Sequence, residues 1–271
     1  MLAPKAENPS AIGEFWRGLR VQIRCVHALM IRNMMMRYGR GNLGFLWVVI
    51  EPMILTIGVM SVWSLVREPV EHGIRLVMLV LTGYMPLTLW RHLTNNSVFV
   101  FRRNVGLLYH RNISLFDTYL AQSILEFAGT TAALTVVTTA LTAAGLVEPP
   151  HDYGLMITAW LSIGFYAFGT GLVIASLTER FEVAEKFVQP WQYLMIPLSG
   201  TFFMVEWLPT AAQQIIWFNP SVHCYEMFRA GFFGQEIKTH FELWYPMLWG
   251  LGLVTVGLYW LPRARDRIHF G

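Results

Sequence analysis

Long apolar runs that are almost free of charge are the feature that most constrains the fold of this chain. The run from Leu43 to Val66 contains one ionisable residue, Glu51. Roughly 18–20 such residues in a helix cross a bilayer core about 30 Å thick. Only 14% of the 271 residues are charged, whereas soluble domains carry about 25%. The sequence therefore predicts an all-α polytopic membrane protein.

Six segments are predicted to span the membrane. Their ranges are 43–66, 76–100, 118–147, 155–177, 188–205 and 244–261. Residues 206–241 break the pattern, because their apolar pieces are too short to cross and are interrupted by Pro209 and Pro220. We expect a re-entrant periplasmic hairpin there, between the fifth and sixth spans. The alternative, in which this region crosses fully, gives eight spans.

A basic amphipathic helix is predicted ahead of the first span. From Ile12 to Met36, apolar residues recur at helical spacing and three arginines share another face: Leu19, Ile23, Val26 and Met30 against Arg17, Arg20 and Arg24. This pattern indicates a helix that lies along the membrane surface, although a soluble helix packed on a partner is the alternative and both can hold together. We divide the chain into a cytoplasmic N-terminus, 1–42, and a single transmembrane domain, 43–271.

The basic residues predict the orientation, because lysine and arginine favour cytoplasmic segments. With the N-terminus inside, fifteen basic residues fall in cytoplasmic segments and four fall outside: Arg67, Arg75, Arg229 and Lys238. Arg91 lies within a span. We expect a multi-pass membrane protein with both termini in the cytoplasm.

Motifs of hydrolytic chemistry are missing from the sequence. It has no Gly-Lys-Ser/Thr phosphate loop, no His-Glu-x-x-His and no Gly-x-Ser-x-Gly. Gly39, Gly41 and Gly44 spell Gly-x-Gly-x-x-Gly, but they follow a basic helix rather than a strand, so they favour a bend over a dinucleotide site. We expect no catalytic residue, no metal and no bound cofactor. A membrane-embedded glycan-processing enzyme, the less favoured alternative, would need clustered carboxylates in one aqueous loop.

Three ionisable residues are placed inside predicted spans, where each costs roughly 2–3 kcal/mol on insertion scales. They are Glu51, Arg91 and Glu126. Such residues face a bundle interior or a watery path. The sequence leaves two interpretations open: a Glu–Arg pair that locks helices together, or the lining of a substrate path.

Several aromatic residues also fall deep within the predicted spans rather than at their ends. They are Tyr84, Trp90, Trp160 and Tyr166. A passage lined by aromatic rings would let a glycan slide, because sugar rings present apolar C–H faces. Plain core packing is the alternative for each of these residues.

Two sequence patches carry a family resemblance. Arg37-Tyr38-Gly39, Asn42 to Trp47 and Glu51-Pro52 resemble the membrane subunit of capsular polysaccharide exporters, as do Asn219-Pro220, Glu226 and Arg229 before the last span. These exporters are type-2 ABC permeases, a group that also includes O-antigen and teichoic-acid exporters. The likeness covers nearly the whole chain. Lipid and drug permeases of the same superfamily are the remaining alternatives.

The resemblance implies a permease that lacks its own nucleotide site. Two copies would form the pathway, and two copies of a separate cytoplasmic ATPase, which binds the ATP and Mg, would dock on them. A periplasmic polysaccharide-export adaptor and an outer-membrane channel would complete the assembly, and no nucleic acid is expected. The cargo would be a lipid-linked acidic capsule polymer moved across the inner membrane.

The resemblance also implies roles for two short segments. Phe101–Arg111 matches the position of the helix that couples such permeases to their ATPase, and its candidate contacts are Arg102, Arg103, Tyr109, His110 and Arg111. The periplasmic hairpin would act as an outer gate, with Tyr225, Glu226 and Arg229 as candidate gate residues. Glu226 and Arg229, three residues apart on a helix, are expected to pair with each other or to touch the emerging glycan.

Overall fold

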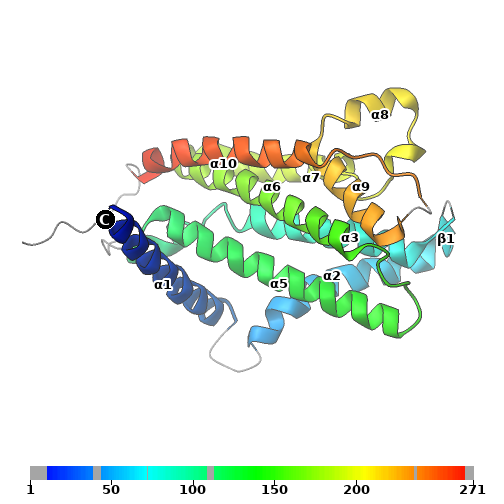
Figure 1. Ribbon diagram of the computed structural model, residues 1–271, viewed down its shortest axis with the longest axis horizontal. Coiled ribbons are helices and arrows are strands. Elements are labelled where there is room, and N and C mark those ends of the chain that lie inside the picture. The colour runs from blue at the N-terminus through cyan, green and yellow to red at the C-terminus, as the bar shows by residue number, and fades with distance from the viewer. Residues whose placement is uncertain (1–10, 39–43, 72, 109–112, 235–236, 266–271) are drawn as a thin grey trace, which may run out of the picture.

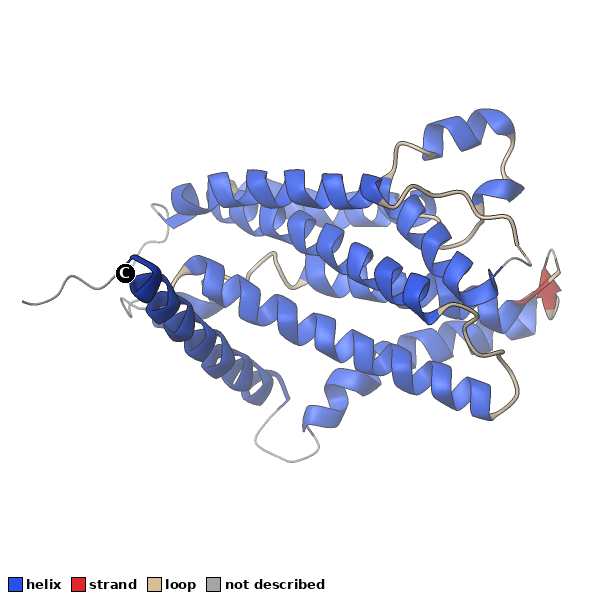
Figure 2. Ribbon diagram, in the orientation of Figure 1, coloured by secondary structure: helices blue, strands red, loops and turns tan. Residues whose placement is uncertain are grey.

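The computed structural model describes residues 11–38, 44–71, 73–108, 113–234 and 237–265, whose longer helices run along the long axis of the molecule (Figure 1). The strands found in these ranges form one short antiparallel hairpin, β1 (Val70–Glu71) with β2 (Ile74–Arg75) (Figure 2). The helices are α1 (Ala11–Tyr38), α2 (Gly44–Val66), α3 (Leu76–Asn95), η1 (Arg102–Asn104), α4 (Val105–Leu108), α5 (Leu115–Ala143), α6 (Tyr153–Arg180), α7 (Glu182–Leu198), η2 (Val205–Trp207), α8 (Thr210–Ile216), α9 (Pro220–Phe233) and α10 (Trp244–Arg265).

Four of the described helices, α2, α3, α5 and α6, are long and apolar enough to cross a membrane. The protein is thus predominantly helical with several apolar helices, as expected of a polytopic membrane protein. Each of these helices overlaps a span that the sequence predicts. The remaining two predicted spans overlap α7, of 17 residues, and α10, of 22 residues.

Several helix boundaries differ from the predicted ones for local reasons. The predicted second span continues to 100, but α3 ends at Asn95, where the Asn96 and Ser97 side chains bind the carbonyls of the preceding turn. The predicted fifth span continues to 205, but α7 ends at Leu198, and Gly200 then adopts a φ of +95° that a helix cannot contain.

The helices on both sides of the α5–α6 turn begin with polar caps, which a search for apolar runs overlooks. Ser114 and Asp117 form a reciprocal capping box at the start of α5. Asp152 accepts a hydrogen bond from the Leu155 N–H and so caps α6. Both helices therefore begin before the residues predicted from hydropathy, at Leu115 and Tyr153.

Helix α6 lies at the centre of the bundle and packs against α10, α9 and α3. Its contact with α10 is close, since a Cβ added to Gly169 would lie 2.8 Å from the Gly250 carbonyl oxygen. Lipid tails are as apolar as the helix surfaces, so membrane helices associate through close packing of small residues rather than through hydrophobic burial. The glycine at this crossing permits that packing.

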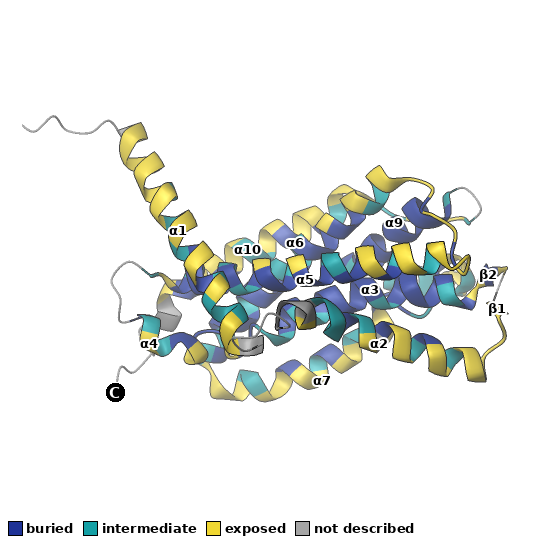
Figure 3. Ribbon diagram, turned by 90° about the horizontal axis from the view of Figure 1, so that it is seen from below, coloured by how far each residue is buried: buried dark blue, intermediate teal, exposed yellow. Residues whose placement is uncertain are grey.

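Helix α1 packs along the beginning of α5 and leaves most of its surface exposed (Figure 3). Val26 and Leu29 are buried against Ala121. Of the predicted apolar stripe, Val26 packs against the bundle whereas Ile23 is 60% exposed, and Leu29, which the stripe did not include, is 4% exposed. The helix thus presents one narrow face to the bundle, and its remaining apolar side chains are open to a membrane surface or a partner.

Candidate functional site

The short segment η1–α4 connects α3 to α5 at the end of the bundle where α1 lies, and Arg102 ties it to the junction of α6 and α7. The Arg102 guanidinium lies 3.1 Å from the Glu185 carboxylate on α7 and 3.7 Å from the Glu179 carboxylate on α6. It also donates to the Thr178 carbonyl at 3.4 Å. A displacement of η1 would therefore act directly on the ends of α6 and α7.

The neighbouring arginine holds a different element. Arg103 Nη2 donates to the main-chain carbonyl of Asn96 at 2.6 Å, which connects η1 back to the end of α3. The other three residues predicted for ATPase coupling, Tyr109, His110 and Arg111, lie outside the described residues. The described part of the candidate coupling segment is thus fixed by two arginines that bind separate parts of the same chain.

Glu126, one of the ionisable residues inside the spans, is buried between α3 and α5. His92 Nδ1 lies 3.0 Å from its Oε2, and Gln122 Nε2 donates to its Oε1 at 2.6 Å. The helix-locking interpretation expects an arginine as partner, whereas the described contacts supply His92. The sequence could have indicated this partner, because His92 is a polar residue of the predicted second span and directly follows Arg91 in α3.

Arg91 points toward α7 instead. Its guanidinium carbon lies 5.9 Å from the ring centre of Tyr193. One turn further along α3, the Asn95 side chain accepts a hydrogen bond of 3.2 Å from Gln189, an exposed residue of α7. Glu51 is half-buried on α2. The facing sides of α3 and α7 therefore carry polar groups at the end of the bundle where α3 finishes.

The four deep aromatic residues belong to one hydrophobic core but make ring contacts with different partners. Tyr84 lies 6.0 Å, between ring centres, from both Trp63 and Phe202. Trp90 lies 5.5 Å from Trp191 of α7. The structure thus distributes these aromatic rings among contacts between different pairs of elements rather than along one continuous row.

The remaining two aromatic residues are part of the packed interior. Trp160 donates from Nε1 to the Thr131 hydroxyl at 2.9 Å, which joins α6 to α5. Tyr166 and Trp90 share the wall of a cavity of about 20 Å³, a space of the order of one water molecule. Trp160 and Tyr166 thus pack within the core in this conformation, and a role for them in a substrate path stays a prediction.

The three candidate gate residues lie on α9, nearly every residue of which is buried. Arg229, which is 0% exposed, donates to the main-chain carbonyls of Gly200 at 2.8 Å, Thr201 at 3.0 Å and Phe203 at 2.5 Å. Tyr225 accepts a hydrogen bond of 3.0 Å from the Thr201 hydroxyl. These two side chains therefore hold the loop that follows α7.

Glu226 fixes two further segments to α9. Its carboxylate accepts hydrogen bonds from the main-chain N–H groups of Val205 at 3.1 Å and His240 at 3.0 Å. The expected pairing of Glu226 with Arg229 is not among the ion pairs of the described residues, and both side chains are buried away from the surface. Each binds main-chain groups instead, so α9 is an anchor for the loops around it.

A partly exposed pair adds to this anchoring outside the membrane-spanning helices. His240 Nε2 lies 2.9 Å from the Glu206 carboxylate. The hydrogen bond from His240, assisted by the charges of Lys238 and His240, holds the pKa of Glu206 below its usual range. Because His240 also binds Glu226 through its main chain, one residue joins the loop before α10 to both η2 and α9.

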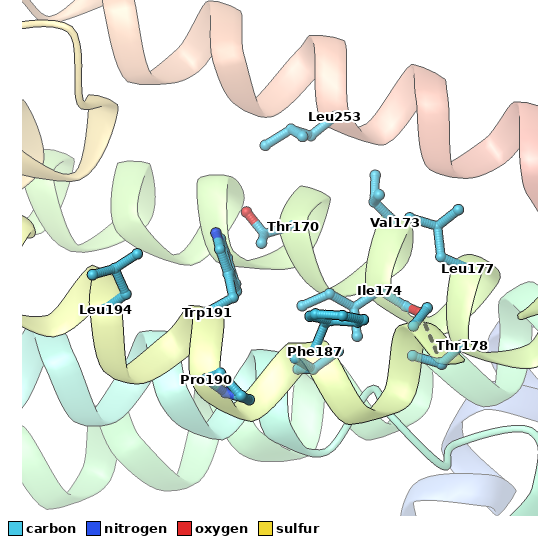
Figure 4. A pocket seen from close by; sticks show the side chains of 12 residues that line it. Thr170, Val173, Ile174, Leu177, Thr178, Phe187, Pro190, Trp191, Leu194 and Leu253 are labelled. Carbon is cyan, nitrogen blue, oxygen red and sulfur yellow. Dashed lines mark hydrogen bonds between the residues drawn. The ribbon is translucent and has the colours of Figure 1, made fainter. Parts of the chain in front are cut away.

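An apolar groove of about 600 Å³ opens between α6, α7 and α10 (Figure 4). Phe187, Trp191 and Leu194 of α7 face Leu253 of α10 across it. The hydroxyls of Thr170 and Thr178 on α6 are already bound to main-chain carbonyls of their own helix. The groove therefore offers a glycan few hydrogen-bond partners, unlike the polar faces of α3 and α7.

Metal ligands are not gathered in the described part of the chain, where no three His, Cys, Asp or Glu side chains lie together as a site would require. The arrangement is suited to transmitting movement between elements rather than to catalysing a reaction. One end of the bundle carries an arginine-tied segment, and the other end carries loops fastened to a buried helix.

Comparison with known proteins finds relatives that match most of the chain. The chain is 41% identical over 244 residues to the capsule polysaccharide export inner-membrane protein CtrC of Neisseria meningitidis serogroup B, a match that covers 90% of this chain and 92% of that protein. It is 34% identical to the capsule polysaccharide export inner-membrane protein BexB of Haemophilus influenzae over the same shares. The polysialic acid transport protein KpsM of Escherichia coli is 23% identical over 92% of this chain and 96% of its own length.

A family model described as ABC-2 type transporter matches residues 24–233, which include α2 to α9 and most of α1. The match therefore contains both the candidate coupling segment and the buried helix with its anchored loops. This chain belongs to the ABC-2 type transporter family.

Proposed function

We propose that this chain is the membrane-spanning permease subunit of an ATP-driven exporter that moves lipid-linked capsular polysaccharide across the bacterial inner membrane. The observation that carries the proposal is its 41% identity, over nine-tenths of its length, to a capsule polysaccharide export inner-membrane protein. Capsule-export relatives from two genera match across the same share of the chain. The O-antigen, teichoic-acid, lipid and drug alternatives lack a comparable match among these relatives.

The proposed topology has six spans, made by α2, α3, α5, α6, α7 and α10, with a re-entrant hairpin between the last two. Helix α1, the η1–α4 segment and the α6–α7 junction lie at one end of the bundle, whereas the β1–β2 hairpin and α8 lie at the other (Figure 1). The excess of basic residues at the first end supports a cytoplasmic location for it and for both termini.

In this proposal a separate cytoplasmic ATPase, present in two copies, supplies the energy, and the chain itself hydrolyses nothing. ATP and Mg bind to that partner. The ATPase would press on η1–α4, and Arg102 would pass the displacement to α6 and α7 through Glu179 and Glu185. The contact between η1 and the two helix ends is direct, so no intermediate element is required.

The substrate path lies on the polar faces of α3 and α7 and is completed by a second copy of the chain. Exposed Gln189 and half-buried Arg91 would be costly against lipid. A second copy related by a two-fold axis would cover these groups and enclose a path larger than one small chain can form. Glu51 on α2 is half-buried and remains a candidate lining residue.

The outer gate consists of the loops that α9 holds rather than of α9 side chains that touch the glycan. Arg229 and Glu226 fasten the 200–205 loop and His240 to one buried helix. A movement of α7 would therefore pull on a loop whose other attachment is fixed. Beyond this gate, a periplasmic polysaccharide-export adaptor and an outer-membrane channel would receive the polymer.

The proposal is tested by deleting the gene for this chain in its own bacterium and measuring capsule at the cell surface and in the cytoplasm. We expect surface capsule to disappear and polymer to accumulate inside, because synthesis continues while export stops. Re-expression of the wild-type chain restores export. Normal surface capsule together with loss of O-antigen, teichoic acid or drug resistance would replace the cargo with that class.

A further inference from the structure

A polar cavity of about 280 Å³ lies where α1 meets the bundle, outside the path and the gate. Its volume is near the lower end of the roughly 300–1,000 Å³ range of small-molecule sites. Of the seven described residues that line it, six have polar side chains: Arg32, Asn33, Asn96, Arg103, Asn104 and Gln122. Its walls thus come from α1, the end of α3, η1 and the first turns of α5.

The charge of this lining is positive. Two guanidinium groups, those of Arg32 and Arg103, line the cavity, and no carboxylate is found among the lining residues that the structure describes. Arg32 Nη1 donates to the side-chain oxygen of Asn104 at 2.6 Å, so its described partner is a neutral amide rather than an acid. A guanidinium carries five N–H donors in a planar fork that matches phosphate. The site therefore favours an anion with several acceptor oxygens.

The other contacts keep the walls in place. Asn33 Nδ2 donates to Gln122 Oε1 at 3.3 Å, which joins α1 to α5. Gln122 in turn donates to buried Glu126. Arg103 is bound to the Asn96 carbonyl at the end of α3. The walls are thus held in place before any ligand arrives, which lowers the ordering cost of binding. The amide nitrogens of Asn33 and Gln122 already donate within the protein, so the two guanidinium groups are the donors for an anion.

The cavity is at the level of lipid headgroups. Asn96 directly follows α3, and Gln122 lies two turns into α5, and both helices are apolar enough to cross a membrane. Ends of such helices lie at the interface between lipid and water. Helix α1 contributes Arg32, Asn33 and Met36 to the wall of the cavity, and Met35 and Met36 in the same turn are exposed apolar side chains. The anion most abundant at this depth is a lipid phosphate.

We propose that this cavity binds the phosphate of a membrane phospholipid headgroup, in the leaflet at which α1 lies, and that Arg32 is its principal ligand. The bound lipid would bridge α1, η1 and α5. The inference concerns a membrane lipid rather than the exported cargo, so it does not depend on the capsule proposal.

The test uses the full-length protein, delipidated in detergent and incubated with equal amounts of phosphatidylglycerol and phosphatidylcholine, with retained lipid counted by native mass spectrometry. Both headgroups carry the phosphate, but choline adds a positive charge that the guanidinium groups of Arg32 and Arg103 repel. We therefore expect preferential retention of phosphatidylglycerol. Arg32→Gln should lower that retention about tenfold, the effect of one charge-assisted hydrogen bond, whereas Arg32→Lys should keep part of it. The matched control is Arg24→Gln, which removes the same charge from an exposed position of the same helix and should leave retention unchanged.

A second variant guards against misfolding of Arg32→Gln. Asn33→Asp keeps both arginines but adds a negative charge to the wall, and it should also lower phosphatidylglycerol retention. Inorganic phosphate, titrated alone by calorimetry, distinguishes the source of the ligand. Equal retention in Arg32→Gln and Arg24→Gln, or phosphate binding without preferential lipid retention, would overturn the proposal.

Discussion

At the scale of single residues, the loss of Arg229 is expected to lower the free energy of unfolding, because this fully buried side chain holds three main-chain carbonyls of one loop. Arg229→Gln cannot reach the three carbonyls that the arginine binds in the loop after α7. A buried acceptor left without its hydrogen bond costs about 1–3 kcal/mol. We expect a lower midpoint of thermal unfolding in detergent and faster amide exchange in residues 199–206.

The control for that variant is Arg75→Gln, which removes an arginine from an exposed position in β2. Its unfolding midpoint should match that of the wild type within error. If Arg229→Gln unfolds at the same temperature as Arg75→Gln, the buried hydrogen bonds do not anchor the loop, and the outer gate loses its structural basis.

Gly83 of α3 meets the same loop from the other side. A Cβ added there would overlap the Thr201 carbonyl oxygen, a main-chain atom that Arg229 also binds. Gly83→Ala should therefore destabilise the fold by about 1–3 kcal/mol, as overpacking does. Gly58→Ala is the comparison, because nothing lies within 4 Å of that position. Equal yields of monodisperse protein from both variants would show that the loop moves freely away from α3.

At the scale of elements, the ion pair between η1 and α7 can be removed by substitution with little effect on the stability of the fold. The pair Arg102–Glu185 is partly exposed, with 40% and 31% of its side chains accessible, and such pairs contribute about 0–1 kcal/mol. Arg102→Ala and Glu185→Ala should thus fold normally. In vesicles that contain the partner ATPase, each should retain ATP hydrolysis but lower export about fivefold, the factor that corresponds to 1 kcal/mol.

The double variant decides whether the two residues act together. If the ion pair transmits the movement, Arg102→Ala combined with Glu185→Ala should lower export no further than Arg102→Ala alone. Additive losses would mean that Arg102 acts through the ATPase surface instead. Replacement of Arg102 and Arg103 together should uncouple hydrolysis from export more completely, because η1 would then lose its ties to both α6–α7 and α3.

Apolar runs in the sequence predict the long helices well, but they do not predict that α9 is buried and anchors the loops around it. The runs that became α2, α3, α5 and α6 have a length and composition that few other structures can satisfy. Helix α9 has only 14 residues, and its Glu226 and Arg229 have the spacing of an exposed helical ion pair. Their burial depends on main-chain groups of 200–205 and on His240, and no local pattern encodes contacts that arise from the path of distant loops.

The same limit applies to the polar groups inside the spans. Glu126 stands out in the sequence because a carboxyl is costly in lipid. Its partner His92 is 34 residues away on another helix, and a histidine in an apolar run attracts less notice than Arg91 beside it. Sequence reasoning therefore finds the residue that needs a partner, while the packing of α3 against α5 determines which partner it receives.

At the scale of the whole molecule, α7 is a long helix that the rest of the chain covers only in small part, with Val188 and Gln192 as its buried residues. Its polar residue Gln189 is exposed and bound to Asn95. A single chain would present this polar face to lipid, which is unfavourable. A second copy placed over α3 and α7 removes the conflict, and this requirement favours a two-fold dimer through that side.

Cross-linking in membranes tests this arrangement. The two native cysteines, Cys25 and Cys224, are replaced by alanine, and Gln189→Cys is compared with Val256→Cys, an exposed position on α10. A short bis-maleimide should join two chains through position 189, because the two-fold axis brings that position near its own copy. Dimers formed through position 256 and not through 189 would place the second copy on the α10 side, and the polar face of α3 and α7 would no longer line the path.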